Sequence, residues 1–588
     1  MPEAIPATDY ANVFAGLAAR ATATAELEDR LRVLVLRNIT VEGLDALLLH
    51  HLQSMGVDGE VVFGGYGSMV QDLLASDGPA ARLRPTLIVL ALSLDELDPG
   101  YGQAGWSSGA AREQLASLLA LLAAQSSATV VVHTFLPPLW PAQGLLIDAK
   151  GLDLPSQVEA VNRGLVQAVQ EFSPRLVLID HDRILRRLGA AAALDPRGRY
   201  LWRAPFKRAF LDDWARQLAR VGAALLGRAK KVLVLDCDDT LWGGVVGEDG
   251  IDGIALQPGE YPGRAYFEFQ ANVLQLAQRG VLLVLCSKNN EADVLQVLDQ
   301  HPHCLIQRQH LAGYRVNWQD KASNIASLAK ELNLGLDSFV FVDDNPVECQ
   351  LVAGLLPAVT VLQVPGKLYE LPPMLFASGL FDTLQVTQED RDRAQMLQVE
   401  AHRKADQGAF ETLGDYLASL QIEAEIHRAG PAELARVAQL TQRTNQFNLT
   451  TRRYSEPEIA ALMHSADAAV YTLTVRDRFG SLGLVGVLIA RLRGEEAVID
   501  TFLMSCRALG RQLEDALLEV CLAELAGGRG AVVCRAEYLP TLKNTQVADY
   551  WPRRGFIEVD EGLTGQRYRR DIAASSGALP AHVKILRG

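Results

Sequence analysis

Short apolar runs alternate with amphipathic stretches along residues 1–225. Five runs have the length and composition of buried strands: RLRVLVLRNIT, GEVVFGGYG, PTLIVLAL, ATVVVHTFLPP and PRLVLIDHDRI. Helical periodicity lies between them, for example over Val41–Met55 and Gly109–Gln125. Strands that alternate with helices are typical of an α/β domain with a parallel sheet. We expect a loop over the Ala-rich stretch 187–200.

The pattern changes twice further along the chain. A second α/β series starts at Lys231, with strands that end at Asp236, Ser287 and Asp344. A charged, helix-prone stretch follows, and then a mixed α+β pattern with the strands AAVYTLTVRD, LVGVLIARL, EAVIDTFLMS and AVVCRAEYL. We therefore predict an α/β multidomain protein. Its predicted parts are an N-terminal domain (1–229), a middle domain (230–385), a helical connector (386–420), a C-terminal domain (421–575) and a tail (576–588).

Composition narrows the class of protein. A chain of 588 residues exceeds what one hydrophobic core usually supports, which fits several domains. The net charge of −14 argues against nucleic-acid binding, because nucleic-acid binders normally carry a basic face. No apolar run reaches about 18 residues, so we expect no membrane span. The first twenty residues lack the pattern of a signal peptide, and none of the seven cysteines forms a C-x-x-C pair. These features predict a cytoplasmic protein with reduced thiols.

Three carboxylates follow an apolar strand in KVLVLDCDDTLWGGVVGEDG (231–250), namely Asp236, Asp238 and Asp239. Ionised carboxylates this close repel one another, and burying them is costly unless a cation holds them. Asp and Thr are also ordinary cap residues of helices, so capping is the alternative interpretation.

Polar residues also end or follow the other predicted elements of the middle domain. VLLVLCSKNN carries Ser287, NWQDKASNIASLAKEL places Lys321 at the start of a helix, and SFVFVDDNPVECQ contains Asp343 and Asp344. The carboxyl ends of the strands in a doubly wound sheet face one crevice, so these side chains are expected to converge with Asp236. Mg²⁺ would satisfy the carboxylates, and Ser287 with Lys321 would donate to phosphate oxygens.

This set of motifs resembles the haloacid dehalogenase (HAD) superfamily, whose members carry D-x-D-x-T, a strand-end Ser or Thr, a Lys and an acidic pair. The resemblance implies that Asp236 is the nucleophile that accepts a phosphoryl group. It implies that Asp238 protonates the leaving oxygen and then activates water. Mg²⁺ would be bound by Asp236, the Asp238 carbonyl and Asp343, while Asp344 would orient Lys321 or a metal-bound water.

The same resemblance assigns the phosphate contacts, which are Thr240, Ser287 and Lys321. It gives Asp239 no role, and we expect an exposed turn residue there. The segments between Thr240 and Val281 and between Asn289 and Lys321 are too short for the separate cap domain that many HAD phosphatases carry. We therefore expect an open site that suits a phosphate carried on a large substrate.

Four stretches of the C-terminal domain together resemble a GNAT acyltransferase fold: LTQRTNQFNLTTRRYSE, RDRFGSLGLVGVLIARL, IDTFLMSCRALGRQLEDALLE and EYLPTLKNTQVADYWPRRGF. In that fold a strand splays from its neighbour, and the amides of the next helix N-terminus bind the phosphates of a pantetheine arm. By this resemblance Arg507, Gly510 and Arg511 form the pantetheine-binding loop. Gln512 stands where a small residue is common.

The order of the domains resembles the FkbH-like proteins of polyketide pathways, with DDTLWGGVVGEDG, NWQDKASNI, FVDDNP, RTNQFNLTTRRY and MSCRALGR as the most specific motifs. Those members of this family that supply three-carbon units divert 1,3-bisphosphoglycerate, remove phosphate and load a glyceryl group on the phosphopantetheine arm of an acyl carrier protein. We expect Cys506 to carry the acyl group, because a strand end before a helix N-terminus lowers a thiol's pKa. Cys237 is the rival, but its side chain is expected to point away from Asp236 and Asp238.

The N-terminal domain resembles an SGNH hydrolase fold without the hydrolase residues. Arg37–Thr40 follows the first strand where Gly-Asp-Ser would be needed, and Asp180 and His181 have the wrong spacing for Asp-x-x-His. We expect a docking domain in which His133 is structural. Acyl carrier proteins are usually acidic, so docking on this acidic chain needs a local basic patch. We predicted that patch in the C-terminal domain, at Arg452, Arg453, Arg507, Arg511, Arg567, Arg569 and Arg570.

Two alternatives stay open at this stage. The chain could be a Mg²⁺-dependent phosphatase of a small metabolite, with flanking domains used for oligomerisation or docking. It could also be a catalytically quiet scaffold, although the complete set of phosphatase motifs argues against that.

Overall fold

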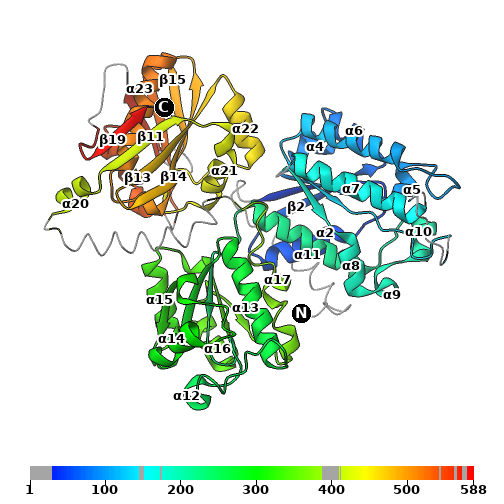
Figure 1. Cartoon of the computed structure of the whole chain (residues 1–588). Helices are drawn as coiled ribbons and strands as arrows, with labels where there is room; N and C mark the ends of the chain where they lie inside the picture. The colour runs from blue at the N-terminus through cyan, green and yellow to red at the C-terminus, as the bar shows by residue number, and fades with distance from the viewer. Residues whose placement is uncertain are drawn as a thin grey trace. The chain divides into compact units, whose positions relative to one another are not determined.

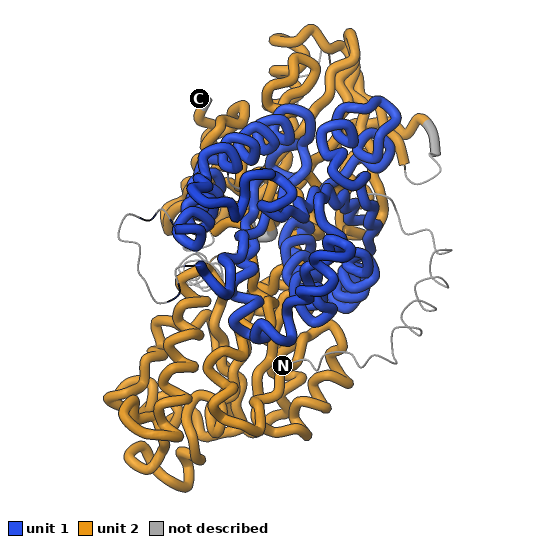
Figure 2. The backbone as a smooth tube through the Cα atoms, turned by 90° about the vertical axis from the view of Figure 1, so that its right-hand side faces the viewer, with its two compact units in different colours: residues 1–226, 455–458 blue, residues 227–454, 459–588 orange. Residues whose placement is uncertain are grey.

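The computed structural model describes residues 30–142, 144, 151, 153–172, 175–386, 388, 410, 412–541, 544–561, 566–572 and 579–587. Contacts between Cα atoms divide the chain into two compact units (Figure 2). Unit 1 comprises residues 1–226 and 455–458, and unit 2 comprises residues 227–454 and 459–588. Unit 1 contains one sheet, and unit 2 contains a middle and a C-terminal sheet.

The sheet of unit 1 has five parallel strands in the order β2-β1-β3-β4-β5 (Figure 1). They are β1 (Leu31–Arg37), β2 (Gly59–Tyr66), β3 (Leu87–Ala91), β4 (Thr129–His133) and β5 (Leu176–Ile179). Its longer helices are α2 (Leu44–Ser54), α6 (Gly109–Gln125), α7 (Leu154–Phe172) and α11 (Arg208–Leu225). All five strands lie where the sequence predicts them, and every residue of β3 and β4 is buried. Since successive residues of a strand point to opposite faces, both faces of β3 and β4 are covered, as in a doubly wound sheet.

Shorter helices occupy the connections of unit 1. They are α3 (Met69–Leu74), α4 (Pro79–Leu83), α5 (Leu94–Leu97), α8 (His181–Leu188), α9 (Ala190–Ala193) and α10 (Pro196–Trp202). The loop that we expected over 187–200 is therefore wrong. Alanine favours helix, and the side chain of Asp195 accepts a hydrogen bond from Gly198 N at 2.9 Å, which caps α10.

Two histidines stack in the core of unit 1, His133 at the end of β4 and His181 at the start of α8. Their ring centroids lie 3.9 Å apart with an interplanar angle of 6°. His133 Nε2 accepts from Leu92 N at 3.1 Å, whereas the ring nitrogens of His181 have no hydrogen-bond partner among the described residues. Burial lowers the pKa of His133 to about 4 and the pKa of His181 well below its usual value. Both rings are neutral parts of the core, which supports the structural role expected for His133.

The middle sheet has five parallel strands in the order β10-β9-β6-β7-β8. They are β6 (Val232–Leu235), β7 (Leu282–Ser287), β8 (Leu311–Val316), β9 (Phe339–Asp343) and β10 (Thr360–Gln363). The sequence predicted the three buried inner strands and missed the two edge strands, whose residues are only partly buried. Residues 230–386 are all described, and they contain no separate cap domain.

Helices and short 3-10 turns connect the strands of the middle sheet. They are α12 (Val246–Asp249), α13 (Gly263–Gln278), α14 (Glu291–Gln300), η2 (Arg308–His310), α15 (Lys321–Glu331), η3 (Leu336–Ser338), α16 (Pro346–Leu355), η4 (Leu368–Glu370) and α17 (Met374–Ser378). As the sequence predicts, Lys321 is the first residue of α15.

The C-terminal sheet is mostly antiparallel, in the order β17-β18-β16-β15-β14-β13-β11-β19, with β12 paired to β15. Its strands are β11 (Ile422–Arg428), β12 (Phe447–Asn448), β13 (Ala468–Asp477), β14 (Gly480–Arg493), β15 (Glu496–Met504), β16 (Val533–Tyr538), β17 (Ile557–Glu561), β18 (Gln566–Asp571) and β19 (Val583–Arg587). Its helices are α20 (Leu413–Ser419), η5 (Pro431–Glu433), α21 (Leu434–Arg443), α22 (Glu456–His464), η6 (Cys506–Ala508), α23 (Leu513–Arg529), η7 (Thr545–Val547) and α24 (Tyr550–Arg553).

The two remaining predictions about the chain's parts have different outcomes. The predicted tail is wrong for residues 583–587, because β19 pairs in parallel with β11. Most of the predicted connector 386–420 lies outside the described residues, and α20 forms within its last part. Among the helices that are described, none is both long enough and apolar enough to cross a membrane.

Candidate active site

The carboxyl edge of the middle sheet brings the predicted residues together. Asp236 directly follows β6, Asp343 ends the neighbouring strand β9, and Ser287 ends β7 on the other side. The register explains this arrangement, since Leu235 pairs with Val342 and Asp236 N donates to the Val342 carbonyl at 3.0 Å. Parallel strands that end in register present their polar residues at one edge.

Lys321 joins the two aspartates. Its Nζ lies 3.0 Å from Asp236 Oδ2 and 2.5 Å from Asp343 Oδ2, and its side chain is only 4% exposed. Burial lowers the pKa of Lys321. The negative charges of Asp236 and Asp343 raise it by more, so that the pKa of Lys321 lies above its usual value. Asp320 caps α15 by accepting from Ser323 N at 2.7 Å, which fixes the place of Lys321. The side chain is thus a permanent cation in the site.

Asp236, Asp343 and Asp344 form an acidic cluster in which one carboxylate oxygen of each residue lies within 4.8 Å of the other two. Burial and the charge of Asp236 raise the pKa of Asp343, and burial with the same charge raises the pKa of Asp344 to about 6. A single ammonium does not balance three carboxylates. Hard oxygen ligands at this spacing suit a divalent cation such as Mg²⁺.

Two buried oxygens of the site have no hydrogen-bond partner among the described residues, Asp236 Oδ1 and Thr240 Oγ1. Unpaired buried polar atoms are costly, so they mark a place where a ligand or an ion supplies the missing contact. Asp236 Oδ1 is therefore an unpaired acceptor that can serve as the nucleophile, while the other oxygen, Oδ2, is held by Lys321.

Asp238 has a different environment from Asp236. Its Oδ1 accepts from Trp242 Nε1 at 2.8 Å and from Val246 N at 3.1 Å, and its Oδ2 accepts from Asn289 Nδ2 at 2.7 Å. Burial, helped by the charge of Asp236, raises the pKa of Asp238. The Asp238 carboxylate does not belong to the acidic cluster of Asp236, Asp343 and Asp344. The predicted metal contact is made by the backbone carbonyl of Asp238, and it stays a prediction. A carboxyl with a raised pKa and a fixed orientation suits proton transfer.

We expect Trp242→Phe to lower kcat for a phosphomonoester about tenfold to a hundredfold, because one of the three donors that orient Asp238 is lost. Steady-state kinetics on the folded variant would check this. Trp318→Phe is the matched control, since Trp318 is largely exposed and should leave kcat unchanged. Equal kcat for the wild type and Trp242→Phe would show that this donor does not position Asp238.

Asp239 organises the turn after the motif. Its backbone has φ of 50°, and its Oδ1 accepts from Gly244 N at 2.8 Å. Gly244 has φ of 91°, and a Cβ there would lie 2.6 Å from Asp249 Oδ2. Asp239 is thus a turn residue, as expected, but it is half-buried and not exposed. Its side chain holds the Gly-rich loop that carries Val246 to Asp238.

Ser287 and Cys237 are both buried beside the acidic cluster. Burial, then the charge of Asp236, raises the pKa of Cys237 well above its usual value, while a hydrogen bond with Ser287 acts in the opposite direction. The thiolate of Cys237 is therefore strongly disfavoured, which weakens it as the rival nucleophile. The phosphate contact of Ser287 stays a prediction.

The predicted pantetheine loop follows β15. Cys506 begins η6, but its side chain lies outside the described part of the structure. Arg511 is buried, and its Nη1 donates to the Arg507 carbonyl at 2.5 Å. Gly510 and Gln512 both have positive φ, of 77° and 59°. The Arg511 side chain thus contacts the backbone of its own loop, and the pantetheine contacts of Arg507, Gly510 and Arg511 stay predictions.

Acidic residues occupy the first turn of α23, directly after this loop. They are Glu514 and Asp515, and Asp515 is paired with Arg554 at 2.5 Å. Burial raises the pKa of Glu514, and its Oε2 has no hydrogen-bond partner among the described residues. These carboxyl groups already use the positive end of the helix dipole, which weakens the case for an anion there.

The motif RTNQFNLTTRRY lies along β15. β15 pairs with β16 only over Glu496–Val498, so the two strands separate beyond that point. There Phe447 and Asn448 pair with Met504 and Leu503, and Leu449 donates its N–H to Phe502 O at 3.1 Å. The segment Phe447–Leu449 therefore pairs with β15 where β15 has separated from β16.

Two arginines of the same motif are held inside the domain. Arg452 pairs with Glu537 at 2.7 Å and donates to the Asp500 carbonyl at 2.8 Å, and Arg453 donates to the Gln442 carbonyl. Charge reversal at these two positions would break partly buried interactions inside the domain. The docking patch, which also includes Arg507, Arg511, Arg567, Arg569 and Arg570, stays a prediction.

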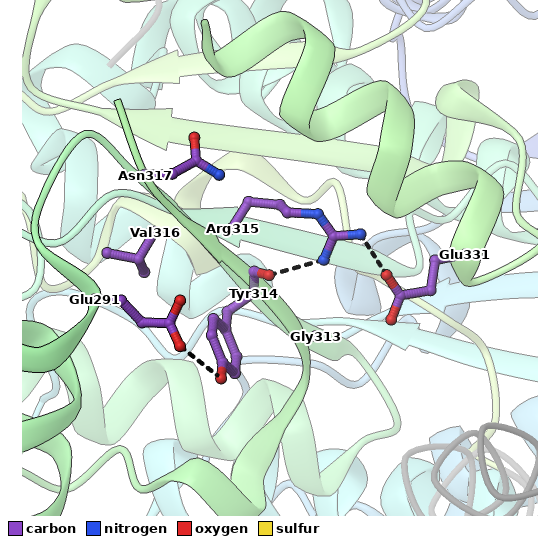
Figure 3. Close-up of a pocket in the computed structure, with 7 residues that line it drawn as sticks. All are labelled: Glu291, Gly313, Tyr314, Arg315, Val316, Asn317 and Glu331. Carbon is purple, nitrogen blue, oxygen red and sulfur yellow. Dashed lines mark hydrogen bonds and ion pairs between the residues drawn. The ribbon is translucent and has the colours of Figure 1, made fainter. Parts of the chain in front are cut away.

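A pocket of about 390 Å³ opens at the exposed side of β8 (Figure 3). It is lined by Glu291, Gly313, Tyr314, Arg315, Val316, Asn317 and Glu331. Glu291 accepts from the Tyr314 hydroxyl at 3.3 Å, and Arg315 pairs with Glu331 at 2.5 Å (Figure 3). None of these residues belongs to the predicted phosphatase site.

The parallel sheet, the strand-end carboxylates and the buried Lys321 define the middle domain as a phosphatase domain of the HAD type. Residues 231–356 match the family NIF, described as NLI interacting factor-like phosphatase. Among solved structures, the chain is similar to the N-terminal part of the protein BF1531 from Bacteroides fragilis, which contains a phosphatase domain and is complexed with Mg. The identity is 24% and the TM-score 0.57, over 63% of this chain and 99% of that one.

Other solved structures match the chain over a smaller part. One is the ribosomal-protein-S18-alanine N-acetyltransferase of Escherichia coli, with 17% identity and a TM-score of 0.21 over 27% of this chain and 99% of that one. Another is the GNAT domain of a protein from S. lividans, with 19% identity and a TM-score of 0.21 over 25% and 89%. At these scores they carry no argument about the fold of the C-terminal domain. No curated protein matches the chain.

Proposed function

We propose that the middle domain is a Mg²⁺-dependent phosphatase that forms an aspartyl phosphate at Asp236. The observation that carries this proposal is Asp236 Oδ1, a buried carboxylate oxygen without a partner among the described residues, beside the cation Lys321. The acidic cluster of Asp236, Asp343 and Asp344 fits Mg²⁺, and the Bacteroides fragilis structure similar to this chain is complexed with Mg.

Each residue has a role in this reaction. Asp236 Oδ1 attacks phosphorus, the bond to the leaving oxygen breaks, and Asp238 gives that oxygen its proton. Asp238 then takes a proton from the water that cleaves the acyl phosphate, which restores Asp236 and releases inorganic phosphate. Thr240, Ser287 and Lys321 donate to the phosphoryl oxygens. Mg²⁺, when bound, reduces the repulsion between the anionic nucleophile and the phosphate.

We further propose that the whole chain is a glyceryltransferase and phosphatase of the FkbH-like kind. It takes 1,3-bisphosphoglycerate in the cytoplasm and loads a glyceryl unit on an acyl carrier protein. The Cys506 thiol displaces the acyl phosphate, which gives a thioester and inorganic phosphate, and the carrier's pantetheine thiol then takes the acyl group. The remaining phosphomonoester is hydrolysed at Asp236. The support is the set of motifs and the absence of a cap over the described residues 230–386, which suits a carrier-bound substrate.

The flanking domains belong to this proposal as an SGNH-like domain and a GNAT-like domain. In unit 1, Asp180 caps α8 by accepting from Asp182 N, and His181 is buried in an aromatic core. Neither residue is available for hydrolysis, which supports a domain without that chemistry. In the C-terminal domain, the separation of β15 from β16 supports the GNAT-like assignment.

Intact-mass analysis tests whether acyl transfer at Cys506 and phosphate hydrolysis at Asp236 are separate steps. The holo carrier protein is incubated with Mg²⁺, a source of 1,3-bisphosphoglycerate and each variant. We expect Cys506→Ala to lose the acyl adduct and carrier loading but to keep phosphatase activity on a phosphomonoester. Cys304→Ala is the control, because that half-buried thiol lies outside both motifs. An adduct that persists on Cys506→Ala and maps to Cys237 would move the nucleophile to the middle domain. Phosphate release without any adduct would favour a phosphatase of a small metabolite.

A further inference from the structure

A loop orients Asp238, the residue that transfers protons in the proposed phosphatase reaction. Two of the three donors to its carboxylate, Trp242 Nε1 and Val246 N, belong to the Gly-rich loop after the motif. Residues 236–245 are all described, belong to no helix and form only isolated β-bridges. The shape of this loop therefore depends on contacts with other elements. Its precision matters, because a displacement of about 1 Å in an active site can lower the rate about a hundredfold.

Helix α13 holds this loop through Gln270. The Gln270 side chain is fully buried, and its Nε2 donates to the Leu241 carbonyl at 2.9 Å. That carbonyl belongs to the planar peptide group between Leu241 and Trp242, so the bond fixes the backbone directly before the Trp242 side chain. A chain of contacts thus runs from Gln270 through Leu241 and Trp242 to Asp238.

The same amide holds a second backbone segment. Gln270 Oε1 accepts from Leu305 N at 2.9 Å and from Ile306 N at 3.2 Å. The other buried residues of α13 are Gly, Ala, Tyr, Phe, Val and Leu. An apolar side chain would be buried at position 270 at a lower cost, so the amide is explained by the backbone groups that it satisfies. It ties the Gly-rich loop to a segment that is distant in the sequence.

Tyr266 supports the loop from one turn earlier in α13. It lies four residues before Gln270, so both side chains lie on one face of the helix. A Cβ at Gly243 would lie 2.7 Å from Tyr266 Cε2 and 3.2 Å from the Ala255 Cβ. The Tyr266 ring is buried and therefore has little room to move. Helix α13 thus contacts the loop on both sides of Trp242.

We propose that Gln270 is a positioning residue of the phosphatase reaction, assisted by Tyr266, because the two side chains hold the loop that orients Asp238. Gln270 acts through Leu241 and Trp242. The inference rests on the proposed function, in which Asp238 protonates the leaving oxygen. A misplaced Asp238 therefore harms substrates in proportion to their need for that proton. An alkoxide leaving group needs the proton, whereas p-nitrophenolate is stable as an anion.

The readout is kcat/KM for glycerol phosphate compared with kcat/KM for p-nitrophenyl phosphate, at saturating Mg²⁺, on the full chain. Gln270→Glu keeps an oxygen that accepts from Leu305 N and Ile306 N, but it replaces the donor to the Leu241 carbonyl by a second acceptor. We expect kcat/KM to fall about tenfold to a hundredfold for glycerol phosphate and less than about threefold for p-nitrophenyl phosphate. Gln275→Glu, exposed on the same helix, is the matched control and should leave both values unchanged.

Gly243→Ala tests the same loop if a carboxyl group at position 270 prevents folding. Its Cβ would press on the Tyr266 ring, and we expect the same selective loss for glycerol phosphate. Gly259→Ala is the control, because a Cβ at Gly259 would meet no atom within 4 Å.

A double variant tests whether Gln270 acts through Trp242. We expect Gln270→Glu combined with Trp242→Phe to lose less than the product of the two single losses, because both changes act on one carboxylate. Losses that multiply fully would show that the two residues act independently and would overturn the chain of contacts.

The outcomes separate this inference from the proposed function. Equal losses for both esters in the folded variants would indicate a general disturbance of the domain and overturn the inference, while the proposed function would stand. Unchanged kcat/KM for both esters would also overturn the inference alone. A wild type that hydrolyses neither ester would overturn the proposed function and the inference with it.

Discussion

Asp236→Asn is expected to lower phosphate release from a phosphomonoester about 10⁴-fold or more, because the amide has the shape of the carboxylate but is a poor nucleophile. The fold should persist. Lys321 keeps its contact with Asp343 at 2.5 Å, and Asp236 N keeps its backbone bond to Val342. Phosphate release measured at saturating Mg²⁺, with circular dichroism to confirm folding, checks the expectation.

The matched control is Asp239→Asn, three residues further along the same motif. An Asn there still offers an oxygen to Gly244 N, so the turn and the phosphatase rate should both be retained. Near-normal turnover of Asp236→Asn would show that the nucleophile is a different residue and that the reaction assigned to the middle domain is wrong. An equal loss in Asp239→Asn would show that the effect is a general disturbance of the turn.

The sequence predicts the residues of this site well because they stand at the ends of strongly apolar strands. Asp236, Ser287 and Asp343 each follow or end a run that is buried on both faces, so their place at the carboxyl edge follows from parallel pairing alone. The position of Lys321 at the start of a helix is predictable, because Asp320, a common N-cap residue, precedes it. In such cases local pattern and overall fold agree.

The partners of Asp238 could not be predicted in the same way. Trp242 and Asn289 are far apart in the sequence, and only the path of the Gly-rich loop brings both side chains to one carboxylate. The strand β12 could not be predicted either, because two residues, Phe447 and Asn448, are too few to show a hydrophobic period. The position of β12 depends on the separation of β15 from β16. Edge strands such as β8 were missed because a partly buried strand carries a weaker hydrophobic pattern.

Charge along the sequence also proved an incomplete guide to docking. Arg452 and Arg453 looked like a basic patch, but both are bound to groups of their own domain. A cluster of arginines indicates a partner surface only where exposure accompanies the charge, and exposure depends on the fold.

The buried histidines of unit 1, His133 and His181, are neutral in the folded chain. The pKa of His133 is about 4 in the folded chain, against about 6.5 for an unfolded histidine, and the pKa of His181 is also well below 6.5. Well above pH 6.5 neither state binds a proton, so the full stability is present. As the pH falls below 6.5 the unfolded chain takes up protons that the folded chain excludes, and stability is lost.

At pH 5.0 we therefore expect unit 1 to be less stable than at pH 7.5 by about 2 kcal/mol from His133 alone, and His181 adds to the loss in the same direction. Hydrogen exchange of peptides from β4 and α8, corrected for the intrinsic pH dependence of exchange, measures this opening free energy. His181→Phe should reduce the difference, because a Phe among the aromatic rings of Phe206, Phe210 and Trp214 cannot be protonated. His303→Gln in the middle domain should leave it unchanged. Protection in unit 1 that is equal at both pH values would mean that the stacked pair accepts a proton inside the core, which would contradict two neutral, fully buried rings.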